Sequence, residues 1–325
     1  MSGAHLHGSV VVTGAGGFVG KALCAELSAR GVAVTAAVRK RGATATGASG
    51  ILRAVEVGNI DGATDWSNAV AGASVVIHLA ARAHILRDDA ADPLAVFRQT
   101  NVEGTLQLAR AALAADVGRF VFVSSVGVNG NANLAPFTVT DGPAPVEPYA
   151  VSKLEAELAL RALLTGSAME LVIVRPPLVY GPDCPGNFRR LLKLVAMGLP
   201  LPLGSVRGKR SFVSVWNLVD FLCVCAFDMR AAGQMFLVSD MEDVALPGLL
   251  RGLARGMQKD LTLLPFSPRL LRLLAAAVGK AALFDKLCGS LTVDPSQART
   301  LLGWTPPVSL DDGLRRTGAW YAQRP

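Results

Sequence analysis

The stretch VVVTGAGGFVG, residues 10–20, decides the fold of the first half of this chain. It begins with a β-branched apolar run, passes through closely spaced glycines and ends where a helical pattern opens. Gly14 allows a tight turn, Gly17 lets the backbone approach a pyrophosphate, and Gly20 permits close packing of the helix on the strand. Because a helix N-terminus carries unpaired N–H groups and the positive end of a dipole, the pattern predicts a dinucleotide site. A plain glycine turn is the alternative.

Outward from this turn, short β-branched runs alternate with helical patterns. We predict strands at 10–13, 33–38, 51–57, 74–79, 119–124 and 171–175, and helices at 18–30, 93–115 and 149–164. Apolar runs without polar alternation indicate strands that are buried on both faces, and strand–helix alternation indicates a parallel sheet that is covered on both sides. The predicted fold class is therefore α/β: a Rossmann-like doubly wound parallel sheet with a smaller mixed α/β lobe.

The pattern loosens after residue 180, where loops rich in Gly and Pro appear. Further elements are expected as helices at 188–197 and 244–256 and a strand at 235–239. A chain of 325 residues corresponds to about two domains. We predict a nucleotide-binding domain over 1–180, with a return segment at 212–240, and a substrate lobe over 181–325.

Composition narrows the class of protein. The chain is 51% hydrophobic and 18% charged, which excludes an intrinsically disordered protein. Its net charge of +7 suits an anionic partner. The sequence has no run of five basic residues and no basic–aromatic interleaving, so nucleic acid is not expected as a partner. A phosphate-bearing small molecule needs only a few Arg and Lys side chains in a cleft.

The cysteines and histidines indicate a reducing compartment and no metal centre. The five cysteines include no C-x-x-C pair, and Cys223 and Cys225 are too close for an ordinary disulfide framework. His5 and His7 form the one close histidine pair, in a predicted tail, so no metal site is expected. Residues 1–8 are not the apolar core of a secretory signal, and we expect a cytoplasmic protein.

The apolar stretch 261–283 has the length of a membrane span. A span needs about 20 mostly apolar residues, and here prolines and cations interrupt the run. They are Pro265, Pro268, Arg269, Arg272 and Lys280. We therefore predict a core helix and no transmembrane segment, with a peripheral amphipathic contact as the alternative.

Arg39 lies 19 residues after Gly20, at the predicted end of the second strand. An acidic residue in this region would bond the ribose 2′-hydroxyl of NAD, whereas an arginine can hold the 2′-phosphate of NADP. Arg39, Lys40 and Arg41 carry three positive charges and no carboxylate, so the sequence favours NADP over NAD. A solvated strand end is the alternative. Weaker candidates for contact with the adenine follow the third strand, at Asn59, Ile60 and Asp61.

Tyr149 and Lys153 are four residues apart and therefore lie on one face of a predicted helix. A phenol with a pKa of about 10 is a poor acid–base catalyst at neutral pH. An adjacent ammonium stabilises the phenolate and lowers that pKa. An ordinary surface Tyr–Lys pair is the alternative. The catalytic interpretation gains support from Ser124 and Ser125, which end the upstream strand and can place a hydroxyl beside the phenol.

Together these motifs resemble those of a known family. The T-G-x-x-G-x-x-G start, the serine that ends the fifth strand and the Y-x-x-x-K pair are similar to the extended short-chain dehydrogenase/reductases. Further segments resemble that family's nucleotide-sugar epimerases, dehydratases and 4-ketoreductases: HLAAR at 78–82, NVEGT at 101–105, RPPLVYGP at 175–182 and LLGW at 301–304 with Pro306. The likeness covers nearly the whole chain.

The resemblance implies roles for residues at the matching positions. Tyr149 would be the acid/base for the sugar oxygen, Lys153 would bind the nicotinamide ribose, and Ser125 would hydrogen-bond the same sugar oxygen. Ser125 is chosen over Ser124 because family members place this hydroxyl five residues before the glycine of a Val-Tyr-Gly segment. Here the segment is VNG at 128–130, in which asparagine replaces the usual tyrosine.

The resemblance also implies which residues hold the cofactor and the substrate. The cofactor contacts would come from the glycine turn, the strand ends and the catalytic pair: Gly14, Gly17, Phe18, Val19, Gly20, Arg39, Asn59, Ile60, Leu79, Ala80, Ala81, Tyr149 and Lys153. Asn187 resembles the asparagine that contacts the nucleotide diphosphate. Arg210 resembles the arginine of an Arg-Asp-Tyr/Phe segment, although Ser211 stands in place of the acid. Family members often pair as homodimers, so a homodimer is expected.

Three reactions of the family can be weighed on the residues. Dehydratases place a carboxylic acid and a carboxylate straight after the serine, where this chain has Val126 and Gly127. Epimerases hold NAD tightly and return the hydride to the other face of the sugar, whereas reductases release oxidised cofactor, which suits NADPH. Arg39 therefore favours a reductase.

The segments SSVGVNG at 124–130 and PLPLG at 200–204 resemble those of bacterial enzymes of surface-polysaccharide (O-antigen) synthesis. These include 4-reductases of the UDP-N-acetyl-quinovosamine type and the UDP-glucose 4-epimerase subgroup. The expected activity is 4-keto-hexose reduction on a UDP-sugar, with UDP-glucose or UDP-N-acetylglucosamine 4-epimerisation as the alternative. A non-catalytic dinucleotide-binding scaffold on the same fold is the third possibility.

Overall fold

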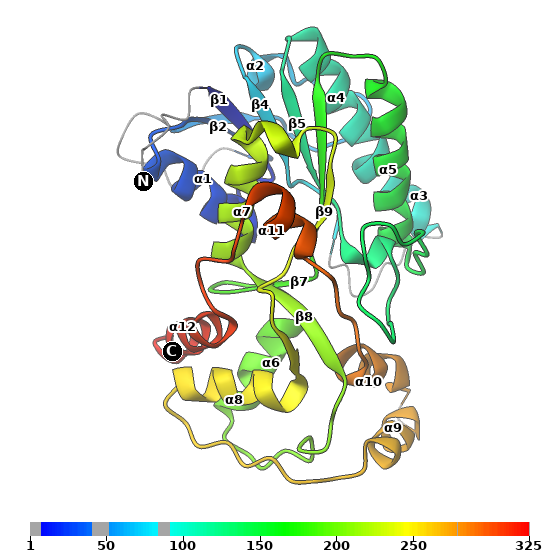
Figure 1. Cartoon of the computed structure of the whole chain (residues 1–325), viewed down its shortest axis with the longest axis vertical. Coiled ribbons are helices and arrows are strands. Elements are labelled where there is room, and N and C mark those ends of the chain that lie inside the picture. Colours follow the sequence, from blue (N-terminus) through cyan, green and yellow to red (C-terminus); the bar gives the residue numbers. More distant parts are fainter. Residues whose placement is uncertain (1–7, 41–51, 84–91, 278, 325) are drawn as a thin grey trace.

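The computed structural model describes residues 8–40, 52–83, 92–277 and 279–324, and Figure 1 shows them as two lobes. The larger lobe is built on a seven-stranded sheet in the order β3-β2-β1-β4-β5-β6-β9, with every neighbouring pair parallel. Its strands are β1 (Ser9–Thr13), β2 (Ala33–Val38), β3 (Leu52–Glu56), β4 (Val75–His78), β5 (Arg119–Val123), β6 (Glu170–Arg175) and β9 (Met235–Leu237). The strand order reverses between β1 and β4, which is where open α/β sheets bind ligands.

Helices cover both faces of this sheet. One face carries α1 (Phe18–Ala29), α7 (Val215–Phe227) and α11 (Ser296–Leu302), and the other carries α2 (Ser67–Val70), α4 (Gly104–Ala114) and α5 (Pro148–Leu164). The sequence-based fold class, a doubly wound parallel sheet with a smaller mixed lobe, is confirmed.

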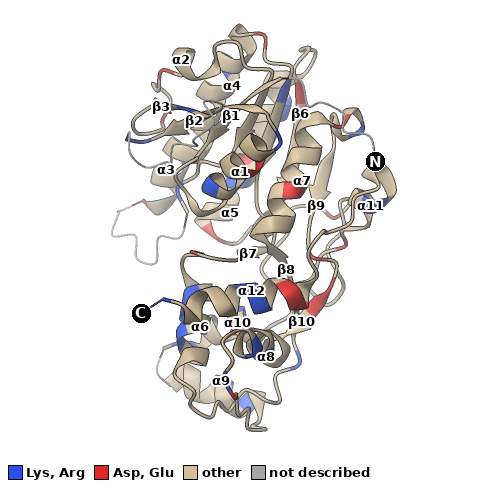
Figure 2. Ribbon diagram, turned by 90° about the vertical axis from the view of Figure 1, so that its left-hand side faces the viewer, with Lys and Arg blue, Asp and Glu red and all other residues tan. Residues whose placement is uncertain are grey.

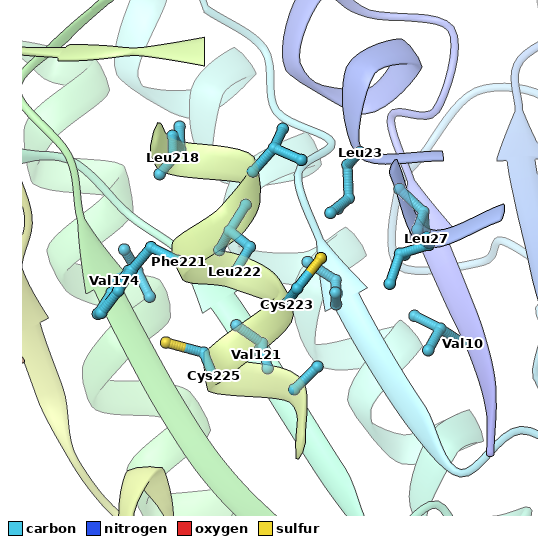
Figure 3. Packing of buried hydrophobic residues seen from close by; sticks show 14 of the residues in the cluster. Val10, Leu23, Leu27, Val121, Val174, Leu218, Phe221, Leu222, Cys223 and Cys225 are labelled. Carbon is cyan, nitrogen blue, oxygen red and sulfur yellow. The ribbon is translucent and has the colours of Figure 1, made fainter. Parts of the chain in front are cut away.

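The core on the α1 side forms between two helices and the sheet. Figure 3 shows Leu23 and Leu27 of α1 facing Leu222 of α7, with Val10 of β1 and Val121 of β5 below them. All five side chains are fully or almost fully buried. Each such side chain contributes about 1.5–3 kcal/mol through burial. This packing fixes α1, and therefore the glycine turn before it, against the sheet.

The smaller lobe surrounds a three-stranded sheet. Its strands are β7 (Leu178–Tyr180), β8 (Lys209–Ser214) and β10 (Asp243–Ala245), and its helices are α6 (Asn187–Ala196), α8 (Leu246–Gly256), α9 (Pro268–Ala277), α10 (Ala281–Cys288) and α12 (Leu310–Ala322). β8 pairs with β7 in parallel and with β10 antiparallel. Between β8 and β10 the chain returns to the larger lobe, where it forms α7 and then β9. The domain boundaries at 180 and at 212–240 stay predictions.

The helix predicted over 93–115 is interrupted. It consists of α3 (Pro93–Arg98), a π-helical turn η1 (Gln99–Glu103) and α4. The turn places Asn101 in the interior, and α4 then begins at Gly104, where a Cβ would come 2.5 Å from Ile60 Cγ2. π turns of this kind are frequent at functional sites.

The prediction of a core helix over 261–283 is wrong. The segment contains two short helices, α9 and α10, and no residue of α9 is buried. Pro268 stands at the first position of α9, where its fixed φ suits a helix start. Gly279, with a φ of 70°, lies between the two helices and favours the break. Among the described residues, no helix is both long enough and apolar enough to cross a bilayer.

Candidate active site

The glycine turn between β1 and α1 is too tight for larger residues. A Cβ at Gly20 would come 2.2 Å from the carbonyl oxygen of Gly14, and a Cβ at Gly14 would come 2.9 Å from the amide nitrogen of Ala80. Gly17 is the N-cap of α1, no side-chain hydrogen bond caps the helix, and its first turn holds no acidic residue. The N–H groups and dipole of α1 therefore fit an anionic pyrophosphate.

A cleft with a volume of about 450 Å³ opens beside this turn. One wall is the turn and the start of α1, with Gly16, Gly17, Phe18, Lys21 and Ala22; the other is Pro182, Asp183, Pro185, Val215 and Trp216. In the second wall, Pro182, Asp183 and Pro185 follow β7 at the entrance to the smaller lobe, and Val215 and Trp216 begin α7. A ligand on the glycine turn would therefore extend along the boundary between the lobes.

The residues predicted to touch the rest of the cofactor follow the carboxyl ends of neighbouring strands. Arg39 follows β2 and is exposed, and the pairing of Ala37 with Thr13 sets this strand end beside the glycine turn. Arg41 lies outside the described residues, as do His5 and His7. The other predicted contacts follow β3 (Asn59, Ile60) and β4 (Leu79, Ala80, Ala81).

A buried chain of hydrogen bonds runs from the glycine turn to α4. The amide of Ala80 donates to Thr13 Oγ1 (3.2 Å), and Thr13 Oγ1 donates to His78 Nδ1 (2.6 Å). His78 Nε2 donates to Thr105 Oγ1 (2.9 Å), which donates to the carbonyl oxygen of Asn101 (2.7 Å). We assign this tautomer because Thr105 gives its hydroxyl hydrogen to a carbonyl, which can only accept. Burial lowers the pKa of His78 to about 3, so the imidazole stays neutral.

Asn101 joins the loop after β4 to α5. Its Oδ1 accepts from the amide of Arg82 (2.8 Å), and its Nδ2 donates to the carbonyl of Arg82 (3.2 Å) and to Ser152 Oγ (3.0 Å). Ser152 Oγ in turn donates to the carbonyl oxygen of Tyr149 (2.8 Å). The π turn therefore positions the backbone at Tyr149. From the sequence we identified this asparagine only as part of a matching segment, because its partners are distant along the chain.

Tyr149 and Lys153 lie on successive turns of α5. The ring of Tyr149 is partly buried and packs edge-on against Phe97, with 6.2 Å between ring centroids. Lys153 is only 1% exposed, and its Nζ lies 4.1 Å from the centroid of the Phe122 ring on β5. Phe122 thus supplies a cation–π contact to the buried ammonium.

The expected lowering of the phenol pKa is not what the structure shows. Burial raises the pKa of Tyr149 to about 12. Burial also lowers the pKa of Lys153 to about 7, and the charge of Glu157 opposes that change. The reason is that the interior disfavours the phenolate and the ammonium alike.

We expect Lys153→Met to lower turnover by about 10²-fold or more and to stabilise the fold below pH 7. The pKa of Lys153 in the folded chain, about 7, is below its unfolded value. Below pH 7 both states hold the charge and the folded state bears the full desolvation cost. That cost disappears as the pH rises toward the unfolded pKa of about 10.4.

The stabilisation by Lys153→Met should therefore be largest below pH 7 and vanish near pH 10, which thermal melts across this range can measure. Lys209→Met, at an exposed position of β8, is the matched control and should show no such pH dependence. A melting temperature below that of wild type in acid would contradict the prediction.

A second cavity, of about 250 Å³, lies where the two lobes meet. It brings together Ser125, which follows β5, and Arg210 of β8. Ser125 Oγ accepts from the amide of Gly127 (3.1 Å). Arg210 donates to the carbonyl of Gly289 (3.3 Å) and forms no ion pair with any described carboxylate, so its charge is available to a phosphate group.

The cavity wall does not include every predicted residue. Ser124 is buried and does not line it, which favours Ser125 as the substrate-facing serine. Tyr149 and Lys153 also lie outside the wall, although Glu147, two residues before Tyr149, lines it. Phe188 lines the cavity next to Asn187, whose side chain is not among those described.

Glu147 and Lys286 form an ion pair on the cavity wall that sequence reasoning missed. The pair joins α10 to the residue that precedes α5. Asn131 Nδ2 also donates to Glu147 (3.4 Å). The sequence carries no signal for this contact, because Lys286 lies just beyond the segment that we predicted to be a core helix.

The comparisons with known proteins agree with this geometry. Residues 10–238 match the model of the NAD dependent epimerase/dehydratase family. The chain belongs to that family. The resemblance to the nucleotide-sugar branch of the extended short-chain dehydrogenase/reductases is thereby confirmed, and the protein is an NAD(P)-dependent enzyme of the epimerase/dehydratase family.

Two relatives and one solved structure show which members of the family this chain is similar to. A UDP-glucose 4-epimerase of Vibrio cholerae is 41% identical over 319 residues, which cover 97% of this chain and 96% of the relative. The N-acetyl-alpha-D-glucosaminyl-diphospho-ditrans,octacis-undecaprenol 4-epimerase of Escherichia coli O157:H7 is 27% identical, over 81% of this chain and 82% of its own length. Among solved structures of the epimerase/dehydratase fold, MoeE5 in complex with UDP-glucose and NAD is 25% identical, with a TM-score of 0.76 and coverage of 96% of this chain and 98% of its own.

Proposed function

We propose that the chain is a UDP-sugar 4-epimerase that uses NAD. The observation that carries the proposal is the 41% identity to the Vibrio cholerae UDP-glucose 4-epimerase over 97% of the chain. Ser125, Tyr149 and Lys153 stand at the positions that match the family's motifs, which supports the proposal. Arg39 alone favours a reductase over an epimerase, and the identity to the Vibrio cholerae relative reverses that preference. The relative from Escherichia coli is named as a 4-epimerase of an N-acetylglucosaminyl group on diphospho-undecaprenol, which supports an N-acetylhexosaminyl diphosphate as well as a hexosyl diphosphate among the substrates.

Tyr149 would carry the proton in both directions. When bound on the glycine turn, the dinucleotide supplies the acceptor and donor of hydride for the sugar carbon. The phenolate of Tyr149 would take the proton of the 4-hydroxyl, become the neutral phenol, and later return the proton to the same sugar oxygen, so sugar and enzyme keep their proton count. A pKa of about 12 is too high for proton exchange with the sugar near neutral pH. The reaction therefore needs a positive charge close to Tyr149, because such a charge stabilises the phenolate.

Ser125 and Arg210 would orient the substrate in the 250 Å³ cavity. Ser125 would hydrogen-bond the sugar oxygen, and Arg210 would pair with the diphosphate. Burial lowers the pKa of Arg210, which reflects a desolvated cation that an anionic ligand would compensate. The apolar side chains of Phe188 and Leu191 complete the wall and suit the flat face of a nucleobase.

A 4-ketoreductase is the second candidate, and Arg39 is the observation that favours it. Its side chain is exposed after β2, beside the glycine turn, and only basic residues follow directly. An arginine in this place can hold the 2′-phosphate of NADP, the cofactor that suits a reductase.

Incubation of the purified chain with UDP-glucose or UDP-N-acetylglucosamine, without added cofactor, separates the two candidates. An epimerase converts each accepted substrate to its C4 epimer, which proton NMR resolves, and mass spectrometry of the denatured protein finds retained NAD. Tyr149→Phe is the control and should form no epimer. Absence of epimer, together with consumption of NADPH in the presence of a UDP-4-keto sugar, would overturn the proposal in favour of the reductase.

A further inference from the structure

The outward face of α9 is apolar although it meets solvent. Leu270, Leu273 and Leu274 stand at positions i, i+3 and i+4 and are 45%, 65% and 55% exposed. Leu271 and Ala275, on the other side of the helix, are less exposed. A helix that only shields the body of a protein carries polar residues on its outer face. Here the inner and the outer faces are both apolar.

The extended segment before α9 enlarges this face. Leu264 and Phe266 are 48% and 37% exposed. With Leu270, Leu273 and Leu274 they make five exposed large apolar side chains within eleven residues, which we call the apolar ridge. Figure 1 shows α9 at the outer edge of the smaller lobe, beside α10 and away from the large sheet. Exposed apolar side chains gathered in this way mark an interaction surface.

The charge around the ridge has one sign. Residues 261–280 contain three basic residues and no acidic residue. Arg269 and Lys280 form no ion pair with a described carboxylate, whereas Arg272 pairs with Asp285 of α10 (2.8 Å) and fixes α9 to its neighbour. The whole segment 246–288 holds seven basic and two acidic residues, and Figure 2 shows Lys and Arg on the helices of the smaller lobe. An occupant of this surface must therefore be apolar and anionic together.

We propose that the apolar ridge docks on an anionic lipid surface, with α9 lying in the plane of the membrane. An amphipathic helix with leucines on one face and cations at its border binds this kind of interface. A second copy of the chain fits less well, because a two-fold contact places the same patch on both sides and brings Arg269 and Lys280 near their own copies. The proposal goes beyond the epimerase activity and does not depend on it.

Docking would bring the cavity close to the lipid surface. α10, which follows α9 directly and is tied to it by the Arg272–Asp285 pair, contributes Lys286 and Leu287 to the cavity wall. The surface that contacts lipid is thus one helix away from the proposed substrate site.

Flotation of the purified full chain with vesicles tests the proposal. We expect the chain to float with vesicles of phosphatidylcholine and phosphatidylglycerol, and to do so weakly with phosphatidylcholine alone or at high salt, because screening weakens exposed charges. The variant Leu273→Gln/Leu274→Gln should reduce binding about tenfold or more, since two leucines no longer enter the acyl region. Arg269→Glu/Lys280→Glu should also reduce it by about tenfold, because each cation contributes to attraction by anionic lipid.

Met229→Gln removes an apolar side chain that is 83% exposed in the turn after α7, in the larger lobe, and is the matched control, which should float like wild type. The turnover of a soluble UDP-sugar should be unchanged in every one of these variants, so that failure of docking and failure of the proposed activity are read separately. Wild-type protein that stays in the aqueous fraction overturns the proposal. A loss of dimer by light scattering in Leu273→Gln/Leu274→Gln, with no vesicle binding by wild type, overturns it in favour of a second copy.

Discussion

Tyr149→Phe is expected to remove nearly all turnover while leaving dinucleotide binding intact. The substitution deletes only the hydroxyl that would exchange a proton with the sugar oxygen, and such acid–base groups contribute about 10²–10⁴-fold to rate. The aromatic ring keeps its edge-on contact with Phe97, and the backbone carbonyl of residue 149 still accepts from Ser152. The glycine turn and α1 are untouched.

The measurement is a pair of titrations. Turnover of the UDP-sugar gives the loss in rate, and protein fluorescence on addition of NAD gives the affinity for the dinucleotide. Tyr321→Phe, on α12, is the control and should change neither value. Unchanged turnover in Tyr149→Phe would exclude Tyr149 from the mechanism, and loss of NAD binding would show that the residue acts through the fold.

The parts of this site that could be predicted from sequence are local. The glycine turn, the strand before it and the helix after it are all encoded within residues 10–20, and the Tyr149–Lys153 spacing places both groups on one face of a helix whatever surrounds them. The doubly wound sheet could also be predicted from local patterns, because each buried strand is a continuous apolar run.

The features that the sequence did not predict depend on contacts between distant segments. The π turn exists because Asn101 bonds Arg82 and Ser152, which helical spacing cannot reveal. The pKa of Tyr149 rises because the surrounding chain buries it. The stretch 261–283 is apolar enough for a core, and only the fold shows that the outer face of α9 is exposed among the residues that the structure describes.

Asn129 is the departure from the family pattern that the structure explains best. Its Oδ1 accepts from Arg175 (3.0 Å), at the end of β6. The same guanidinium forms a two-point ion pair with Glu157 of α5, at 2.9 and 2.5 Å. Both charged side chains are buried, with 6% and 3% exposure. This pair fastens the helix of Tyr149 and Lys153 to the sheet.

Arg175→Met is therefore expected to lower the free energy of unfolding by about 3–5 kcal/mol, since it leaves Glu157 as an uncompensated buried carboxylate. The double variant Arg175→Met/Glu157→Leu removes both charges and should recover most of that loss, because well-packed apolar groups can replace a buried ion pair at little cost. Urea unfolding of wild type, both single variants and the double variant measures the coupling between the two positions. Equal instability of the single and double variants would show instead that Arg175 acts mainly through Asn129 and the loop that carries Ser125.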